Sequence, residues 1–599
     1  MSIVQPEPGQ TIAGGEARPA PGPSAALTHR QILIILSGLL LGMLLAALDM
    51  TIVSTSIRTI ADDLHGLSVQ AWVTTAYLIT STISTPLYGK LSDLYGRRPF
   101  FLMAISVFVL GSMLCTLATN MYMLAGFRAF QGIGAGGLFS LALAIIGDIV
   151  PPRERAKYQG YFLAVFGTSS VLGPLVGGLL AGQSTILGIA GWRWVFLINV
   201  PIGALALIVV ARVLHIPHTR RDHKIDYPGA LALTLSLVPL LIVAEQGRLW
   251  GWSSGRSIAC YVVGVLGFVG FLWAEERIGE DALLPMRLFR RKTFTIGSTL
   301  NLIIGMGMFG GMAALPLYLQ IVKGHTPTQA GLLMLPLTAG LMSGSIISGQ
   351  FISRTGRYKI FPIMGSLLFT IGMLLLGTIK VDTSLTMVSF YSVVFGLGLG
   401  FNMQTLVLAI QNSVPPQDMG VATSSATFFR QMGGTLGTAV FLSVLFGSVL
   451  SNIKDAFIAA AKTPAFQQAL HDPSVLANPN NKPVLDLLKG GASAGGFSVN
   501  DSSFIAKLDP RLARPVLQGF AQSMDLIFTM GAGVLAIAFV VSFFLPEEKL
   551  RTQSGIQARE AQANLPAQTG SEAPAETVAV SARAPQPTPS RDRASTPAS

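Results

Sequence analysis

The sequence GKLSDLYGRRP occupies residues 89–99, and a related sequence, GQFISRTGRYK, occupies residues 349–359. The two stretches align at an offset of 260 residues, with Gly96 matching Gly356 and an arginine following each glycine. Each stretch lies between apolar segments of about 20 residues, the length that crosses a hydrocarbon core of about 30 Å. This pattern predicts a chain of membrane-spanning helices that arose by duplication.

Three further pairs of short sequences repeat at an offset of 264 residues. No single pair is specific, but four pairs in register indicate a duplicated unit. We therefore predict two six-helix halves, an arrangement in which transporters bind substrate between the repeats. The pairs are PPRER and PPQDM (151–155 and 415–419), LGPLV and LGTAV (172–176 and 436–440), and GIGAG and GLGLG (132–136 and 396–400).

The composition argues against a soluble protein. Of the 599 residues, 51% are hydrophobic and only 12% are charged, whereas an ordinary soluble protein carries about 25% charged residues. A soluble enzyme, a nucleic-acid-binding protein and a disordered scaffold are therefore disfavoured. The sequence also lacks a nucleophile–base set, metal-ligand spacing and a Gly-rich phosphate loop, so we expect no enzyme, no metal site, no cofactor and no direct use of ATP.

We expect an all-α polytopic membrane protein with fourteen spans. The expected divisions are a disordered tail (1–28), a six-helix bundle (29–215), two inserted helices with flanking loops (216–292), a second six-helix bundle (293–550) with a long external loop (452–523), and a second disordered tail (551–599). The spans are expected at 31–57, 69–88, 100–118, 121–147, 158–182, 193–213, 227–245, 257–274, 294–321, 328–352, 359–379, 384–412, 418–450 and 524–545.

The basic residues predict the orientation. With the N-terminus in the cytoplasm, the inside loops carry about three times as many Lys and Arg residues as the outside loops. The same rule explains the net charge of +12 without a nucleic-acid partner. We therefore expect a multi-pass protein of the cytoplasmic membrane with both termini in the cytoplasm.

Three charged residues lie deep inside apolar spans: Asp49, Arg128 and Arg430. An ion at this depth costs about 2.5–3.5 kcal/mol, so each needs a partner or a path to water. Counting about 1.5 Å per residue puts all three at one level. We predict that Asp49 carries a proton and that Arg128 is its counter-charge; a static ion pair is the alternative. Arg430 either completes this network or meets an anionic or polar group of the substrate.

The loop at 89–99 has the composition of a gate. Gly89 and Gly96 permit close approach and a positive φ angle. Asp93 can hold Arg97 or Arg98, or face the positive N-terminus of a neighbouring helix. We predict a latch between the two halves on the inside, and an ordinary solvated loop is the alternative.

A second motif, GPLVGG, lies in the fifth span. Pro174 removes a helix hydrogen bond and bends the axis, while Gly173, Gly177 and Gly178 permit tight contact between helices. By themselves these residues indicate only a bend and a close contact.

The substrate cavity is predicted from polar and flexible side chains in the second half. These residues suggest an adaptable apolar cavity with few polar groups, which suits bulky neutral or amphiphilic compounds better than small dications. The candidates are Asn301, Met306, Gln320, Asn402 and Gln404.

Several motifs together resemble the fourteen-helix drug:proton antiporters of the major facilitator superfamily, the EmrB/QacA type. The resemblance covers about residues 30–550 and implies that GPLVGG is the antiporter motif of an exporter and that 89–99 is a gating loop. Two places depart from the family pattern: Ser-Ile-Arg stands at 56–58 instead of Ala-Leu-Pro, and Ser353 matches Asp93. The motifs are LDMTIVSTSI around Asp49, GKLSDLYGRRP (89–99), RAFQGIGAGG (128–137), GPLVGG (173–178), GWRWVFLINVPIG (191–203) and LPEEKLR (545–551).

The expected function is proton-coupled efflux of lipophilic drugs or other hydrophobic small molecules by alternating access. Its partners are then the lipid bilayer, the substrate and protons, with the protein working as a monomer and driven by the proton gradient. One alternative keeps the fold but exports a lipid or an amphiphilic metabolite with the help of 452–523. Another is a receptor or scaffold that transports nothing, which the buried charges disfavour.

Overall fold

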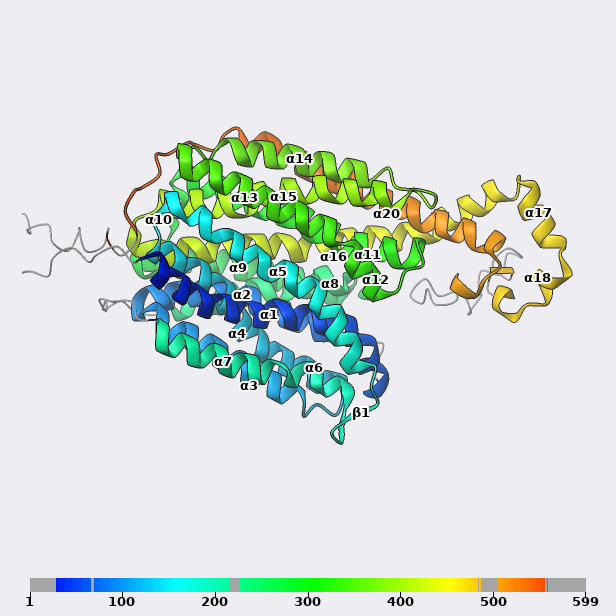
Figure 1. Cartoon of the computed structure of the whole chain (residues 1–599), viewed down its shortest axis with the longest axis horizontal. Helices are drawn as coiled ribbons and strands as arrows, with labels where there is room; N and C mark the ends of the chain where they lie inside the picture. Colours follow the sequence, from blue (N-terminus) through cyan, green and yellow to red (C-terminus); the bar gives the residue numbers. More distant parts are fainter. Residues whose placement is uncertain are drawn as a thin grey trace, which may run out of the picture.

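The computed structural model describes residues 28–65, 69–214, 226–482, 484–485, 505–554 and 557. Most of both predicted tails and part of 452–523 lie outside these residues. In the described part the chain is almost wholly helical, with one short hairpin in which β1 (Thr185–Ile186) pairs antiparallel with β2 (Ile189–Ala190). The long helices run alongside one another, with the first helices below and the last above in the view of Figure 1.

The first bundle contains six long helical segments. The sixth is divided at Ile198 into two helices, and Pro201, which lacks an N–H, lies in the first turn after the division. The helices are α1 (His29–Asp63), α2 (Ala71–Tyr95), α3 (Arg97–Cys115), α4 (Met121–Ile149), α5 (Pro152–Ala181), α6 (Trp194–Leu197) and α7 (Asn199–Val213), with a 3₁₀ turn at Gly191–Arg193 before α6.

The second bundle repeats this plan. Its members are α11 (Lys292–Leu317) with a π-helical end (Tyr318–Val322), α12 (Pro327–Leu333), α13 (Leu335–Thr355), α14 (Ile360–Leu376), α15 (Leu385–Ser413), α16 (Met419–Ala460) preceded by a 3₁₀ turn (Pro416–Asp418), and α20 (Pro510–Ser542). Between the bundles come α8 (Tyr227–Trp250), α9 (Gly255–Ile278), a 3₁₀ turn (Gly279–Asp281) and α10 (Met286–Phe289).

The duplicated glycines make equivalent contacts in the two bundles. In α4, Gly132 and Gly136 lie against the backbone of α2, and Gly134 lies against α3. In α15, Gly396 and Gly400 lie in the same way against α13, and Gly398 against α14. An added Cβ at any of these positions would collide with backbone atoms, so the alternation of glycines sets how closely three helices pack in each half.

Twelve of the described helical segments are long and apolar enough to cross a membrane. Two more helices complete six per bundle by their place in the packing: α14, which has 17 residues, and α2, which carries Lys90 and Asp93 near its end. The fold is therefore all-α and polytopic, with two six-helix bundles and two inserted helices. The count of fourteen spans stays a prediction.

The inserted helices cover one side of the seam between the bundles. We call the seam the surface where α2 and α5 of the first bundle meet α16 and α13 of the second. Buried side chains of α8, such as Leu233 and Leu237, join a cluster with Ile79 of α2 and Phe428 of α16. Helix α8 thus contacts both bundles at once, and α9 packs against α8.

The segment 452–523 is largely helical where it is described, rather than one long loop. Helix α16 continues to Ala460, two short helices follow (α17, Pro464–His471; α18, Pro473–Ala477), with 3₁₀ turns at Pro479–Asn481 and Ile505–Lys507, and α20 begins at Pro510, well before the expected span at 524. Apolar side chains such as Phe457, Phe466 and Val475 are buried against α20 and one another, which explains why the segment folds. We call it the end cap; it projects beyond the bundles in Figure 1.

An ion cluster holds the end cap together. Arg511 donates to Asp472 and to Asp509, each at 3.0 Å. Hydrogen bonds from Ser474 and Arg511 lower the pKa of Asp472 from its usual value, and a hydrogen bond from Arg511 lowers that of Asp509. Both carboxylates are therefore ionised at neutral pH.

Candidate functional site: a buried ion pair and a closed seam

Asp49 and Arg128 form an ion pair in the interior of the first bundle. Arg128 Nη1 lies 2.6 Å from Asp49 Oδ2, and both side chains are almost completely shielded from solvent. The other oxygen, Asp49 Oδ1, accepts hydrogen bonds from Gln131 Nε2 at 3.0 Å and from Asn199 Nδ2 at 2.8 Å. All three partners donate, which is the arrangement that suits an ionised carboxylate.

A ring of neutral groups surrounds the pair. Ser112 accepts from both Gln131 and Asn199 at 2.8 Å, and Arg128 Nη1 also donates to Gln131 Oε1 at 2.7 Å. The guanidinium carbon lies 4.1 Å from the centre of the Tyr77 ring, a cation–π contact. The network thus connects α1, α2, α3, α4 and α7, so a change in the charge of Asp49 would be felt by most of the bundle.

Some hydrogen-bonding capacity in this network is unused. Arg128 Nε, the Asn199 carbonyl oxygen and the Tyr77 hydroxyl are buried without a hydrogen-bond partner. A buried polar atom of this kind carries a desolvation cost that water or a rearranged neighbour can remove. The network is therefore able to take a different set of hydrogen bonds in another state.

Arg430 lies outside the Asp49 network. Its side chain, on α16 of the second bundle, is partly buried, and within the described residues it makes no hydrogen bond or ion pair. The sequence left two roles open for Arg430: to complete the Asp49 network, or to meet an anionic or polar group of the substrate. In the described conformation Arg430 does not complete the network.

The gating-loop residues join the two bundles through Asp93. Arg97 Nη2 lies 2.6 Å from Asp93 Oδ1, and Arg97 Nε lies 2.8 Å from Asp148 of α4. Asp93 also accepts from the backbone N–H groups of Gly420 and Val421, at 3.1 and 2.8 Å, in the first turn of α16. The acid thus holds its own bundle through Arg97 and the other bundle through the N-terminus of a helix.

The remaining loop residues have distinct places. Gly96 has φ of +102°, which an L side chain rarely adopts, and it turns the chain from α2 into α3. Gly89 faces Ser424 and the Gly420 carbonyl oxygen so closely that a Cβ would collide with both. Arg98 takes no part in the seam, because it donates to the Ala211 carbonyl oxygen in its own bundle at 2.6 Å.

The second copy of the loop, in the second bundle, contacts the first bundle through different groups. It has Ser353 in place of Asp93, and the carbonyl oxygens of Ser353 and Arg354 accept from the Arg153 guanidinium at 3.0 and 2.9 Å. Each copy therefore contacts the start of the helix that begins within the PPRER or PPQDM sequence of the other bundle. One contact uses a carboxylate and helix N–H groups, the other a guanidinium and carbonyl oxygens.

Further hydrogen bonds between the bundles lie at the same end of the molecule, which we call the Arg97 end. Arg155 donates to Gln411 Oε1 at 2.6 Å, and Gln411 donates to the Leu143 carbonyl oxygen at 3.2 Å. Among the side-chain hydrogen bonds between the bundles in the described residues, the one farthest from this end joins Thr85 of α2 to Gln431 of α16 at 3.2 Å. The seam is therefore closed at the Arg97 end, from the loops as far as Thr85.

The GPLVGG motif lies where α5 meets both α1 and the second bundle. Gly173 and Gly177 lie against Thr51, Ile52 and Thr55 of α1, and Pro174 faces Gly331 of α12, whose added Cβ would lie 3.2 Å from the proline ring. Gly178 was expected at a close contact too, but nothing lies within 4 Å of a Cβ added there. The reason is its register: Gly173 and Gly177 are four residues apart and share a face of α5, and Gly178 does not.

The predicted cavity residues do not form one surface. Asn402 donates to the Gly398 carbonyl oxygen and lies against Gly365 of α14, inside the second bundle. Asn301 is likewise buried and donates to the carbonyl oxygen four residues earlier in α11. Gln404 is buried with Oε1 unpaired, while Met306 and Gln320 are partly buried. The structure therefore does not bring these five residues together as a cavity lining.

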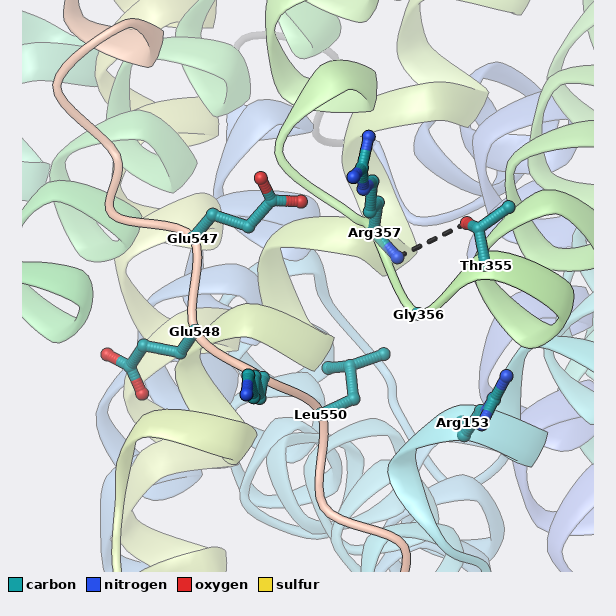
Figure 2. A pocket seen from close by; sticks show the side chains of 8 residues that line it. Arg153, Thr355, Gly356, Arg357, Glu547, Glu548 and Leu550 are labelled. Atoms are coloured by element: carbon teal, nitrogen blue, oxygen red, sulfur yellow. Dashed lines mark hydrogen bonds between the residues drawn. The ribbon is translucent and has the colours of Figure 1, made fainter.

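The LPEEKLR sequence forms a strap over the Arg97 end. Tyr358 donates to the Pro546 carbonyl oxygen, Asn412 donates to that of Lys549, and Arg551 Nη2 donates to that of Val414 at 2.7 Å. Figure 2 shows the strap lying opposite the Thr355–Arg357 turn and Arg153, and these residues line a cavity of about 340 Å³. The strap thus ties the ends of α14 and α15 together next to the seam.

The sequence did not single out the neutral members of the Asp49 network. Gln131 lies in the RAFQGIGAGG sequence and Asn199 in GWRWVFLINVPIG, so the motifs contained both. A neutral amide in an apolar helix costs less than a charge, so it gives a weaker signal than Asp49 or Arg128. Across the described residues, no group of three or more His, Cys, Asp or Glu side chains could hold a metal ion.

Two duplicated six-helix bundles that meet at a gated seam, with an ion pair buried in the membrane-spanning part, define a polytopic membrane transporter. Comparisons with known proteins agree. Residues 39–438 match the sequence profile of the Major Facilitator Superfamily. Multidrug resistance protein 3 of Bacillus subtilis is 38% identical over 527 residues, which are 86% of this chain and 96% of that protein. The multidrug transporter protein MdtP of the same organism is 33% identical, over 88% of this chain and 95% of its own length.

The chain belongs to the Major Facilitator Superfamily and is a transporter, not an enzyme. Its similarity to curated multidrug transporters agrees with the resemblance to drug exporters in the sequence. Among solved structures, that of the proton:xylose symporter XylE has a TM-score of 0.52 at 16% identity and covers 89% of this chain and 99% of the XylE chain. At this identity the likeness shows the fold alone.

Proposed function

We propose that the protein exports lipophilic small molecules from the cell in exchange for protons, by alternating access. The observation that carries the proposal is the Asp49–Arg128 pair, an ionisable acid buried at mid-span with a fixed counter-charge, whose hydrogen-bond partners among the described residues belong to the first bundle. The names of its curated relatives, which are multidrug transporters, support the export of drug-like compounds.

The pair couples a proton to a movement through charge balance. With Asp49 ionised, the site is neutral and the carboxylate accepts from Arg128, Gln131 and Asn199. A proton on Asp49 would leave the Arg128 charge uncompensated and place an O–H among three donors. The first bundle would then gain by moving to a conformation in which water or other groups reach Arg128. Release of the proton on the other side restores the pair.

The seam supplies the movement. By the excess of basic residues in the inside loops, the Arg97 end is the cytoplasmic end, and the state described here is closed to the cytoplasm. Opening this end requires that Asp93 leave the N-terminus of α16 and that Arg153 leave the carbonyl oxygens of the second loop. Both contacts are single hydrogen-bonded clusters, so rocking of one bundle against the other breaks them together. No cofactor enters this scheme.

The test is Asp49→Asn in everted membrane vesicles, with a neutral lipophilic dye such as Nile red and an imposed pH difference of two units. One proton per neutral substrate supports up to about 100-fold accumulation, since each pH unit is about 1.36 kcal/mol. The variant should fold and bind dye but reach no accumulation above equilibrium. Asp62→Asn, which removes an exposed carboxylate from the same helix, is the matched control. Accumulation by the Asp49 variant that disappears when the gradient is collapsed would refute the role of Asp49.

A further inference from the structure

Arg430 differs from the other mid-span arginine in having no partner. Arg128 meets a carboxylate, an amide and an aromatic ring, whereas the Arg430 guanidinium, twelve residues into α16, has no hydrogen bond or ion pair with any described residue. A guanidinium carries five N–H donors and stays charged at any physiological pH. A charge of this kind at mid-membrane is retained where it meets a ligand or water.

The contacts of α16 give the direction in which residue 430 lies. Gly433 and Gly437 face Leu302 and Met306 of α11, in the same bundle. Around the helix, Ser424 and Gln431 face Gly89 and Thr85 of α2, in the other bundle. At about 100° per residue, position 430 falls between Gly437 and Gly434, which both face α11, and about 100° from Gln431. Arg430 therefore starts from the side of α16 that packs on α11, and its partly buried side chain extends from there.

The closed seam gives the level of Arg430. The hydrogen bonds that join the bundles at the Arg97 end extend as far as the pair Thr85–Gln431, next to Arg430 in the chain. Arg430 thus lies beside the last of these hydrogen bonds, while α5 and α12 are in contact farther along the seam through Pro174 and Gly331. Gly305 lies directly against the Arg430 backbone, so α11 and α16 are in close contact behind it.

We propose that Arg430 is the substrate-recognition residue of the transport pathway and that it binds an acidic oxygen group, such as a carboxylate, on an otherwise apolar substrate. The inference rests on the proposed function for the existence of a transport pathway, and it adds the chemical class of the cargo. A planar guanidinium binds a carboxylate through two parallel hydrogen bonds. The ring of Phe309 of α11, which lies against Gly434 on the same side of α16, supplies an apolar group for the rest of the molecule.

The experiment measures equilibrium binding, which requires no proton gradient. The protein is purified into nanodiscs of zwitterionic lipid and titrated with dansyl-undecanoate, a lipophilic carboxylate, or with its methyl ester; empty nanodiscs give the background. The wild-type protein should prefer the carboxylate. Arg430→Gln should weaken carboxylate binding at least tenfold and ester binding less than twofold, and Arg430→Lys should fall between the two because it keeps the charge but loses the two-pronged contact.

Two controls separate this inference from the proton-coupling scheme. Arg290→Gln removes an exposed positive charge from a loop and should leave both affinities unchanged. Asp49→Asn should keep the preference for the carboxylate, even where it abolishes accumulation. Equal losses for the carboxylate and the ester in Arg430→Gln would show a packing role and overturn the inference, as would a wild-type protein that binds the ester as tightly as the acid.

Discussion

At the scale of single residues, the Asp49 network depends on how closely α3 approaches α4. Gly111 comes immediately before Ser112, and a Cβ added at Gly111 would lie 2.6 Å from both Cα and Cβ of Gln131. There is thus no room for a methyl group between the helices at the level where Ser112 and Gln131 meet. The hydrogen bond of 2.8 Å between these side chains requires that contact.

We therefore expect Gly111→Ala to destabilise the first bundle and to impair transport. Overpacking of this kind costs about 1–3 kcal/mol, and moving α3 outward also removes Ser112 from the network. The measurements are the melting temperature in detergent and dye accumulation in everted vesicles, and both should fall. Gly126→Ala is the matched control, because nothing lies within 4 Å of a Cβ added there. Equal melting temperatures for the two variants would contradict the close contact.

The sequence predicted the charged members of this network but not the neutral ones. Asp49 and Arg128 lie at similar depths in their spans, and a buried charge in a membrane needs a counter-charge. These two facts were enough to predict that the two residues pair. The same argument could not place Arg430, since its partner is not another described residue of the chain. It also could not find Asn199 or Ser112, whose contacts depend on the rotation of α7 and α3.

At the scale of elements, the first turn of α16 and the end of α2 form the latch. Asp93 accepts from Arg97 and from two backbone N–H groups of α16, so its negative charge lies at the positive end of a helix. An anion in such a place contributes up to about 2 kcal/mol. Because this contact joins the bundles only in the closed state, its loss shifts the balance toward the open one.

Asp93→Asn should therefore open the Arg97 end. A loss of about 2 kcal/mol changes the ratio of closed to open molecules by about 30-fold. Spin labels at Glu154→Cys of α5 and Gln350→Cys of α13, in a Cys115→Ser and Cys260→Ser background, report the separation of the bundles by pulsed electron resonance. We expect a new population at longer distance in the variant. Asp62→Asn, the same change at an exposed site, should leave the distances as they are; an unchanged distribution in Asp93→Asn would disprove the latch.

Helices were easier to predict than their ends. The fourteen expected spans each overlap a helix, because apolar segments of about 20 residues have few alternatives. The predicted helix ends were wrong where polar and apolar residues mix. Helices α16 and α20 extend into the end cap, where Phe457 and Phe466 are buried by neighbours distant in the sequence. Hydropathy does not report such contacts, since they depend on α17 and α18 folding back against α20.

At the scale of the whole molecule, the duplication explains why the gate has two halves. Each loop contacts the start of the helix that begins within the PPRER or PPQDM sequence of the other bundle, so the two contacts are related by the same pseudo-symmetry as the bundles. Divergence changed their chemistry, from Asp93 with helix N–H groups to Arg153 with carbonyl oxygens. Repeats in the sequence were enough to predict this architecture. The sequence could not predict which of the alternating states is described, because both states use the same residues.

Alternating access requires that α5 and α13 separate at the Arg97 end during each cycle. A Cβ added at Gly160 would lie 3.6 Å from Ile346 Cγ1, so cysteines at these positions are close enough to be joined across the seam. In the cysteine-free background, Gly160→Cys with Ile346→Cys should transport while reduced and stop when oxidised with copper phenanthroline. Dithiothreitol should restore transport, and each single cysteine should be insensitive to the oxidant. Because the link holds the bundles in the closed arrangement without touching Asp49 or Arg430, the oxidised protein should still bind dye. Transport that continued in the fully cross-linked protein would mean that this seam does not open, and the rocking of the two bundles would have to be abandoned.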